Sequence, residues 1–294
     1  TVTYMLDGHM LHEDHLGNQG HLTSGGVQWM TAGRGIIHSE MPQQEAGLMQ
    51  GFQLWLNLPA KEKMKAAAYV DIAPEQIPQL NLPQGSAKVI AGTLQSGNLQ
   101  QSGPIQGLTT DPQYYDLQLE AGQTLSLQLP VTHNAFVYPY AGEVLVQDDK
   151  ELRKVPEHHA GVLTHGNTLT LVAEHSSRVL VLAAAPIGEP IVQYGPFVMN
   201  SVAEIEQAIR DGVMAGAITQ NPVGIGYKTV EAAVKASKGE DVNTPPKSQI
   251  TASTATTTGF TSNRRTANTA ITRCLGYGSG IAASTATTTG FTSY

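Results

Sequence analysis

Short runs of β-forming residues alternate with glycine, proline, asparagine and aspartate from the start of the chain to about residue 193. This close spacing is typical of an all-β sandwich or barrel. Residues 124–129 alternate polar and apolar, which places Leu125, Leu127 and Leu129 on one buried face. Residues 179–183 are continuously apolar, as in a strand covered on both sides. About ten strands are predicted, over residues 1–6, 26–30, 51–58, 88–94, 114–119, 123–129, 135–140, 143–147, 168–173 and 178–183.

Two stretches depart from this β pattern. Residues 59–83 are rich in lysine, alanine and proline, and we expect them to connect two β units. Ser201 to Glu204 form a capping box, which predicts the start of an amphipathic helix. A second helical segment is predicted over residues 228–238. The apolar face of the first helix contains Val202, Ile205, Ala208 and Ile209.

Residues 251–294 have the composition of a disordered tail, with fourteen threonines, three arginines and no acid. Such a segment has too little apolar surface to offset the entropy of ordering. The same eleven residues, ASTATTTGFTS, occur at 252–262 and again at 283–293. Two perfect copies without a periodic apolar face indicate a duplicated segment rather than a solenoid, which needs more units.

Composition narrows the class of protein. The chain of 294 residues has a net charge of −7, which disfavours direct binding to nucleic acid. The longest apolar stretch, residues 179–187, is too short to span a bilayer. The single cysteine, Cys274, excludes an intrachain disulfide framework and a multi-cysteine zinc site, and fits a reducing compartment. We therefore expect a cytoplasmic protein without membrane partners.

Histidines cluster near the start of the chain. Five of the ten histidines lie between His9 and His38, and several carboxylates lie among them. Residues two apart in a strand share a face, so His38 and Glu40 can point into the same cavity. Imidazole together with carboxylate suits divalent iron, manganese or zinc. An H-x-E pair also occurs on solvated strand faces, so the spacing alone leaves both interpretations open.

The residues before His38 indicate a family. The segment GVQWMTAGRGIIHSEMP at residues 26–42 resembles the diagnostic segment of the pirin family, whose members are bicupins. The resemblance covers about the first 210 residues. It extends through TVTYMLDG (1–8), HEDHLGNQG (12–20), GFQLWLNLPAKEKM (51–64) and EPIVQYGPFVMN (189–200).

The resemblance implies two jelly-roll β-barrels packed face to face, with one metal site in the N-terminal barrel. The family's metal, usually iron, is held by three histidines and one glutamate, and the last two of these ligands fall on His38 and Glu40. The first two belong to an H-P-H-R-G-F-E segment that directly precedes the strand TVTY in the family. This chain begins at that strand with Thr1, so we expect an N-terminal truncation that removes both histidines.

Other histidines near this pair are candidates to replace the two upstream ligands. The family carries a similar H-E-D segment without using it for coordination, and ligand geometry has little tolerance, so replacement by His9, His12 or His15 is disfavoured. The second barrel offers no comparable ligand set, as in the family, whose C-terminal cupin is metal-free. Structural roles are assigned to His133, His158, His159, His165, His175, Trp29 and Trp55, and Arg34 is placed either at the pocket mouth or in an exposed turn.

A second resemblance covers residues 211–241. This segment, which contains QNPVGIGY, resembles the C-terminal portion of periplasmic sugar-binding proteins of the ribose-binding type. So short a fragment cannot form a sugar pocket, which needs two whole α/β lobes. The missing start, the abrupt change in composition and the exact repeat favour a chimera or a misjoined reading frame.

These patterns together predict an all-β bicupin with C-terminal helices and a disordered tail. We expect a truncated N-terminal cupin with its connector at residues 1–84 and a C-terminal cupin with its closing helix at 85–210. A sugar-binding-protein-like fragment follows at 211–243, and a low-complexity tail at 244–294.

Bacterial members of the resembled family are described as quercetin 2,3-dioxygenases. The resemblance therefore implies Fe²⁺ or another divalent transition metal, a flavonol-like substrate and O₂, with Glu40 as metal ligand or catalytic base. On this basis we expect an oxygenase that opens the flavonol ring. One alternative is a non-catalytic, iron-dependent regulator that binds a protein, as a transcription coregulator or a modulator of a metabolic enzyme. Another is an inactive remnant, which the missing ligands favour.

Overall fold

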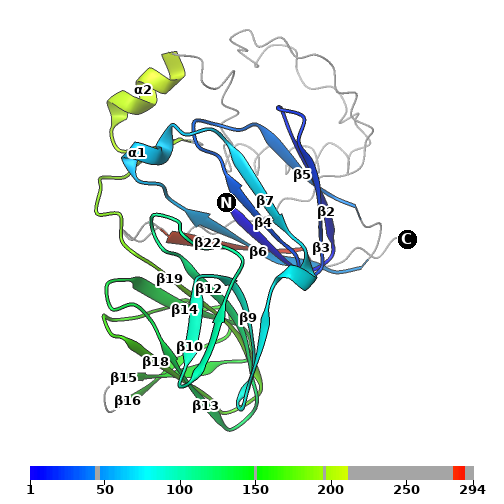
Figure 1. Ribbon diagram of the computed structural model, residues 1–294, viewed down its shortest axis with the longest axis vertical. Helices are drawn as coiled ribbons and strands as arrows, with labels where there is room; N and C mark the ends of the chain where they lie inside the picture. Colours follow the sequence, from blue (N-terminus) through cyan, green and yellow to red (C-terminus); the bar gives the residue numbers. More distant parts are fainter. Residues whose placement is uncertain (44–46, 149–150, 195–196, 211–280, 289–294) are drawn as a thin grey trace, which may run out of the picture. The chain divides into compact units, whose positions relative to one another are not determined.

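The computed structural model describes residues 1–43, 47–148, 151–194, 197–210 and 281–288 (Figure 1). The chain divides into two compact units. The first unit contains residues 1–188 together with 269–294, and the second contains residues 189–268. Nearly all of the described strands belong to the first unit.

The first unit begins with an antiparallel sheet of five strands. Its central strand, β1 (Val2–Asp7), pairs with β4 (Val27–Thr31) on one side and with β6 (Met49–Leu56) on the other. β7 (Ala68–Ile72) lies beyond β4, and β22 (Ile281–Thr288) lies beyond β6. The β-branched and aromatic residues of β1 and β4 favour this extended pairing.

The two faces of this sheet have opposite character. Val2 and Tyr4 on β1 are buried in an apolar cluster, whereas Thr3 between them is a buried polar residue. Thr3 lies opposite Gln28 on β4 and opposite Gln53 on β6. Directly opposed residues share a face, so these three polar side chains line the side away from the apolar cluster.

A sheet of three strands lies over the polar face. It consists of β2 (His9–Asp14) between β3 (Gln19–Thr23) and β5 (His38–Pro42). Side chains join the two sheets, because Gln53 on β6 bonds a carboxylate on β5 and a ring on β2 contacts a ring on β7. The two sheets therefore enclose the interior of an N-terminal barrel, the N-terminal half of the fold.

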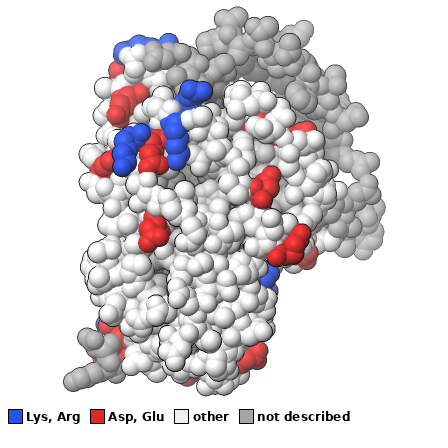
Figure 2. Space-filling model, viewed as in Figure 1, with Lys and Arg blue, Asp and Glu red and all other residues white. Residues whose placement is uncertain are grey.

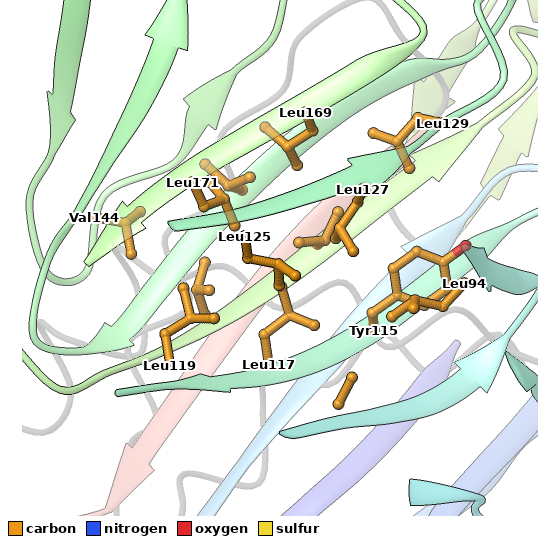
Figure 3. Packing of buried hydrophobic residues seen from close by; sticks show 14 of the residues in the cluster. Leu94, Tyr115, Leu117, Leu119, Leu125, Leu127, Leu129, Val144, Leu169 and Leu171 are labelled. Carbon is orange, nitrogen blue, oxygen red and sulfur yellow. The ribbon is translucent and has the colours of Figure 1, made fainter. Parts of the chain in front are cut away.

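Two antiparallel sheets of six strands form the C-terminal barrel. A cluster of buried leucines, valines and alanines fills the space between them, with Leu117, Leu125, Leu127 and Leu171 among its members (Figure 3). One sheet runs β11 (Leu99–Ser102), β10 (Thr93–Ser96), β13 (Gln123–Gln128), β18 (Thr168–Ala173), β15 (Val144–Asp148) and β16 (Glu151–Val155). The other runs β17 (Gly161–Val162), β14 (Asn134–Ala141), β19 (Ser177–Ala184), β12 (Gln113–Leu119), β9 (Gly85–Ala91) and β8 (Gln79–Leu82).

The two barrels pack through one shared apolar cluster. Val2, Tyr4 and Phe52 from the five-stranded sheet meet Tyr114 and Leu182 from the second sheet of the C-terminal barrel. The predicted all-β class, with two barrels packed face to face, is confirmed. The predicted boundary at residues 84/85 remains a prediction.

Buried polar groups are also present at the interface between the two barrels. Asp116 is 4% exposed, and the hydroxyls of Tyr4 and Tyr140 each donate to its carboxylate at 2.6 Å. Burial, and then the charge of Asp116, raises the pKa of both tyrosines. A buried carboxylate thus joins strands of the two barrels through neutral phenols.

Nine of the ten predicted strands occur as single strands with small shifts at their ends, and the tenth is divided in two. The predicted strand 88–94 is instead two strands, because Gly92, at φ +73°, breaks β9 from β10. The expectation that residues 59–83 break the β pattern is wrong in part. This stretch holds the helix α1 (Ala60–Lys63) and the 3₁₀ helix η1 (Pro74–Gln76), but β7 and β8 complete edges of both barrels.

Charged side chains are sparse on the face of the molecule seen in Figure 2. Most of the basic side chains on this face gather at the upper left of the view beside acidic ones, whereas other acidic side chains stand alone. Within the α1 region, Lys65 and Glu62 form an ion pair at 2.9 Å. Among the described residues, no helix has the length and apolar character needed to cross a membrane.

The second unit contains the hairpin of β20 (Val192–Tyr194) and β21 (Phe197–Met199), followed by the helix α2 (Val202–Arg210). The predicted capping box is confirmed, because Ser201 Oγ accepts from the Glu204 N–H at 3.3 Å and Glu204 Oε2 accepts from the Ser201 N–H at 2.7 Å. Ile205 and Ala208 are buried as predicted, but Val202 is 59% exposed. Val202 is the first residue of the helix and is not a member of the apolar cluster that contains Ile205 and Ala208.

The C-terminal segment differs in part from its prediction. Residues 281–288, expected to be disordered, form β22 in register with β6, from Ile281 opposite Leu56 to Thr288 opposite Met49. Pairing with an open sheet edge supplies backbone hydrogen bonds that the composition alone does not reveal. The predicted helix at 228–238, the sugar-binding-protein-like fragment, Cys274 and the first copy of the repeat lie outside the described residues.

Candidate metal centre

The candidate ligands lie on β5, which pairs with β2. In the register of these antiparallel strands, His12 is opposite Glu40 and Asp14 is opposite His38. Opposed residues share a face, as do residues two apart in one strand. All four side chains therefore project from the same side of the three-stranded sheet.

The Glu40 carboxylate turns toward the five-stranded sheet. The Gln53 side-chain amide donates to both of its oxygens, each at 3.2 Å. The Gln53 carbonyl in turn accepts from Trp55 Nε1 at 3.3 Å. These hydrogen bonds hold the partly buried carboxylate against the five-stranded sheet.

His12 occupies the middle of the site. Its side chain is 3% exposed, and its ring stacks on that of His38 with centroids 5.2 Å apart and 21° between the planes. The Tyr69 ring, from β7 of the facing sheet, has its centroid 5.0 Å from that of the same ring, with 61° between the planes. Among the described residues, neither ring nitrogen of His12 has a hydrogen-bond partner.

The electrostatics follow from this arrangement. Burial lowers the pKa of His38, although the Glu40 charge acts in the opposite direction. Burial alone would raise the pKa of Asp14, but hydrogen bonds, first from Asn18, lower it to about 2. Both groups are thus held in forms that donate electron pairs near neutral pH: a neutral imidazole and an ionised carboxylate.

The other nearby histidines are engaged elsewhere. His9 Nε2 lies 2.9 Å from His21 Nδ1, near the surface. His15 Nδ1 accepts from the backbone N–H of Ile37 at 3.2 Å. Of the three histidines considered as replacement ligands, the structure brings only His12 beside His38.

The residues assigned structural roles mostly behave as predicted. His133 is buried, with its Nε2 3.0 Å from the Asp111 carbonyl oxygen, and Trp29 is buried in the apolar cluster. Trp55 is 41% exposed and belongs to the site's hydrogen-bond chain rather than to a core. Exposed positions are found for Arg34, His158, His159, His165 and His175.

Sequence reasoning missed Gln53 and Tyr69. Both lie in the five-stranded sheet, which the H-x-E pattern does not reach. Gln53 shares the strand face of Trp55, opposite the core-facing Phe52 and Leu54, so the alternation of the run GFQLWLNL did not single it out. Tyr69 lies in the stretch taken for a connector, so its strand was not foreseen.

The donor types present fit a divalent transition metal. Imidazole and carboxylate are ligands that iron, manganese and nickel accept, and the two buried ring nitrogens of His12 have no hydrogen-bond partner among the described residues. The described residues nevertheless contain no group of three His, Cys, Asp or Glu side chains arranged to hold a metal ion. His38 and Glu40 would supply two ligands, and the remainder would come from outside the described residues.

Two antiparallel barrels packed face to face, one with a polar interior that carries a His–Glu pair, define a two-domain cupin. Family models agree, since the Pirin model matches residues 1–56 and the Pirin C-terminal cupin domain matches residues 114–212. The chain belongs to the pirin family.

Named relatives and a solved structure extend this result. A Pseudomonas aeruginosa protein named "putative quercetin 2,3-dioxygenase" is 52% identical over 219 residues, covering 73% of this chain and 76% of its own. Human pirin is 36% identical over 220 residues, covering 72% of each chain. A crystal structure of quercetin 2,3-dioxygenase from Acinetobacter baumannii aligns with a TM-score of 0.65 and 34% identity, over 71% of this chain and 73% of that one.

Proposed function

We propose that this pirin-family protein is a metal-dependent oxygenase of the quercetin 2,3-dioxygenase type, which opens a flavonol ring with O₂. The observation that carries the proposal is that His38 and Glu40 project from the same face of the three-stranded sheet, with the carboxylate hydrogen-bonded by Gln53 of the facing sheet. The names of the bacterial relatives support the reaction class.

His38 and Glu40 would hold Fe²⁺ or another divalent transition metal. When bound, such a metal ion would lower the pKa of the flavonol 3-hydroxyl and would mediate electron transfer between the flavonol and O₂ in a ring opening that releases carbon monoxide.

The protein's own groups prepare this reaction. The Glu40 carboxylate would act either as a metal ligand or as the base that accepts the proton of the 3-hydroxyl, and its hydrogen bonds to Gln53 direct it toward the five-stranded sheet. Gln53 fixes both carboxylate oxygens and so limits the orientations that Glu40 can adopt. The aromatic ring of Tyr69 contributes a flat apolar wall against which a planar ligand can pack.

The test measures three quantities on the same purified chain: metal content, loss of quercetin absorbance under air, and O₂ uptake. We expect bound metal and turnover, with both abolished in His38→Ala. His9→Ala is the matched control, because His9 pairs with His21 away from the site. Equal metal content in the parent and in His38→Ala would contradict the site assignment.

A non-catalytic role is the second candidate, and a surface feature favours it. Ile37 and Met41 flank the His–Glu pair and are 49% and 54% exposed. Exposed apolar side chains beside a metal site suit a protein partner that senses the metal's state. Metal binding without loss of quercetin would favour this regulator, and absence of both would favour an inactive remnant.

A further inference from the structure

Two histidines lie side by side on the outer face of the three-stranded sheet, apart from the candidate metal centre. His9 Nε2 on β2 lies 2.9 Å from His21 Nδ1 on β3, and the centroids of the two rings are 5.0 Å apart. In the register of these strands, His9 is opposite Thr23 and Leu11 is opposite His21, so both histidines project from one face. His12 is three positions along β2 from His9 and therefore belongs to the opposite face.

The strands hold the two rings at a defined spacing. β2 and β3 are paired continuously from His9 with Thr23 to Glu13 with Gln19, and His9 and His21 are diagonal neighbours in this ladder. Further along the strands, the Gln19 side-chain amide donates to Glu13 at 3.1 Å. His21 is exposed and His9 is half-buried, so an ion from solvent can reach the facing nitrogens.

The distance between the two nitrogens matches that between neighbouring ligands on one metal ion. Metal–imidazole bonds are about 2.0–2.1 Å long, so two nitrogens at a right angle around an ion stand about 2.9 Å apart. Two nitrogens at the tetrahedral angle stand about 3.4 Å apart. Right angles between ligands are typical of square-planar or tetragonal Cu²⁺ and Ni²⁺, and Cu²⁺ has the highest affinity in the divalent first-row series.

We propose that His9 and His21 form a surface Cu²⁺ site that links β2 to β3. His9 binds through Nε2 and His21 through Nδ1, each as a neutral imidazole whose proton is on its other ring nitrogen, and water completes the coordination. The exposed His21 ring turns so that both lone pairs meet on the ion. The two residues are twelve positions apart in the sequence, so the pair exists only where the strands are paired, and bound Cu²⁺ stabilises the folded sheet.

The test measures Cu²⁺ binding to the full chain carrying Cys274→Ser and His38→Ala. These substitutions remove the single thiol, which binds and reduces copper, and one ligand of the candidate metal centre. Isothermal titration calorimetry measures the Kd, and the electron paramagnetic resonance spectrum counts the nitrogen ligands, of which we expect two. His9→Ala or His21→Ala alone should raise the Kd about a hundredfold, because the second imidazole acts at a high effective concentration. The double substitution should add little more.

Thermal unfolding separates a site built by the fold from binding to single histidines. Cu²⁺ at a hundred times its Kd should raise the Tm by about 5 °C, because only the folded sheet brings the two rings together. His165→Ala is the matched control, since it removes an exposed histidine of the C-terminal barrel and should change neither the Kd nor the Tm shift. Metal at the exposed pair exchanges with buffer, so desalting before the oxygenase test leaves that test to the candidate metal centre.

Three outcomes would overturn the proposal. An unchanged Kd in both His9→Ala and His21→Ala would show an adventitious ion only, and so would a spectrum with a single nitrogen ligand. An unchanged or lowered Tm with Cu²⁺ would show that the unfolded chain binds the ion equally well. If His21→Ala does not fold, His21→Gln keeps a polar side chain at this exposed position and should raise the Kd by the same factor. None of these outcomes bears on the oxygenase, because its proposed site does not use this pair.

Discussion

The interiors of the two barrels differ in chemistry although their architecture is the same. The C-terminal barrel is filled by leucines, valines and alanines, most of them fully buried. The N-terminal barrel instead encloses Thr3, Gln28 and Gln53 from one sheet, with His12 and Glu40 from the other. Buried apolar side chains contribute stability, whereas buried polar side chains cost stability unless they are paired.

This contrast indicates that the two barrels have different roles, one in stability and the other in ligand binding. The C-terminal barrel has the composition of a core that stabilises the fold, and its histidines lie at its surface or, like His133, bond the backbone. The N-terminal barrel retains polar groups that packing alone would not select. Residues retained against their stability cost are best explained by ligand binding, which supplies the partners they lack.

The largest effect is expected in the apolar interior. Leu127 is 0% exposed in the C-terminal core, and Leu127→Ala should lower the free energy of unfolding by about 2–5 kcal/mol. Urea denaturation followed by circular dichroism measures the change. Leu152→Ala is the control, because Leu152 is 53% exposed and should change stability little. A small effect at Leu127 would mean that the C-terminal barrel is not the stabilising half.

The next largest effect on stability is expected at the interface between the barrels. Tyr4→Phe removes one of the two hydroxyls that donate to Asp116 and should cost about 1–3 kcal/mol. The raised pKa of Tyr4 means that its stabilising contribution is complete below about pH 10 and is lost as pH rises above it. The variant should therefore lose less stability than the parent on moving to alkaline pH. Tyr194→Phe, at a 65% exposed position, serves as the control.

The contrast also explains what the sequence could predict. Strands of the C-terminal barrel, such as β13 with Leu125 and Leu127, show regular alternation because one face is apolar and the other solvated. β2, β3 and β7 were not predicted from the sequence. Polar and apolar residues do not alternate regularly along these strands, and polar residues occur on both faces. A strand that lines a polar interior does not show the pattern that identifies strands.

The site was predictable only where a local motif carries it. The H-x-E spacing and the family resemblance pointed to His38 and Glu40 as candidate ligands, and the strand register places both on one face of the three-stranded sheet, where His38 is exposed and Glu40 partly buried. Gln53, Tyr69 and the burial of His12 depend on pairing between distant strands, which no local pattern specifies. The same limit applies to β22, whose threonine-rich composition predicts disorder but whose pairing depends on the open edge of β6.

Gln53 tests whether the polar interior serves the metal site. Gln53→Leu removes the donor to Glu40 and should lower the affinity for Ni²⁺ about tenfold, because groups that orient a metal ligand have effects of this size. Isothermal titration calorimetry measures the affinity. Gln128→Leu, at an exposed position on β13, should leave it unchanged. Equal affinities in parent and Gln53→Leu would separate Gln53 from the site and weaken the contrast between the barrels.

The smallest effect concerns Asp14 at the end of β2. Its carboxylate accepts from the N–H groups of Leu16 and Asn18 at 2.8 and 2.9 Å and holds the turn that leads into β3. Because the folded-state pKa of Asp14 is lowered to about 2, its contribution is present above about pH 4 and is lost as pH falls toward 2. Asp14→Asn should therefore lower the Tm slightly at pH 6 and show a smaller further loss at pH 3 than the parent. Parallel losses in both proteins would show that acid destabilises the N-terminal barrel through other carboxylates.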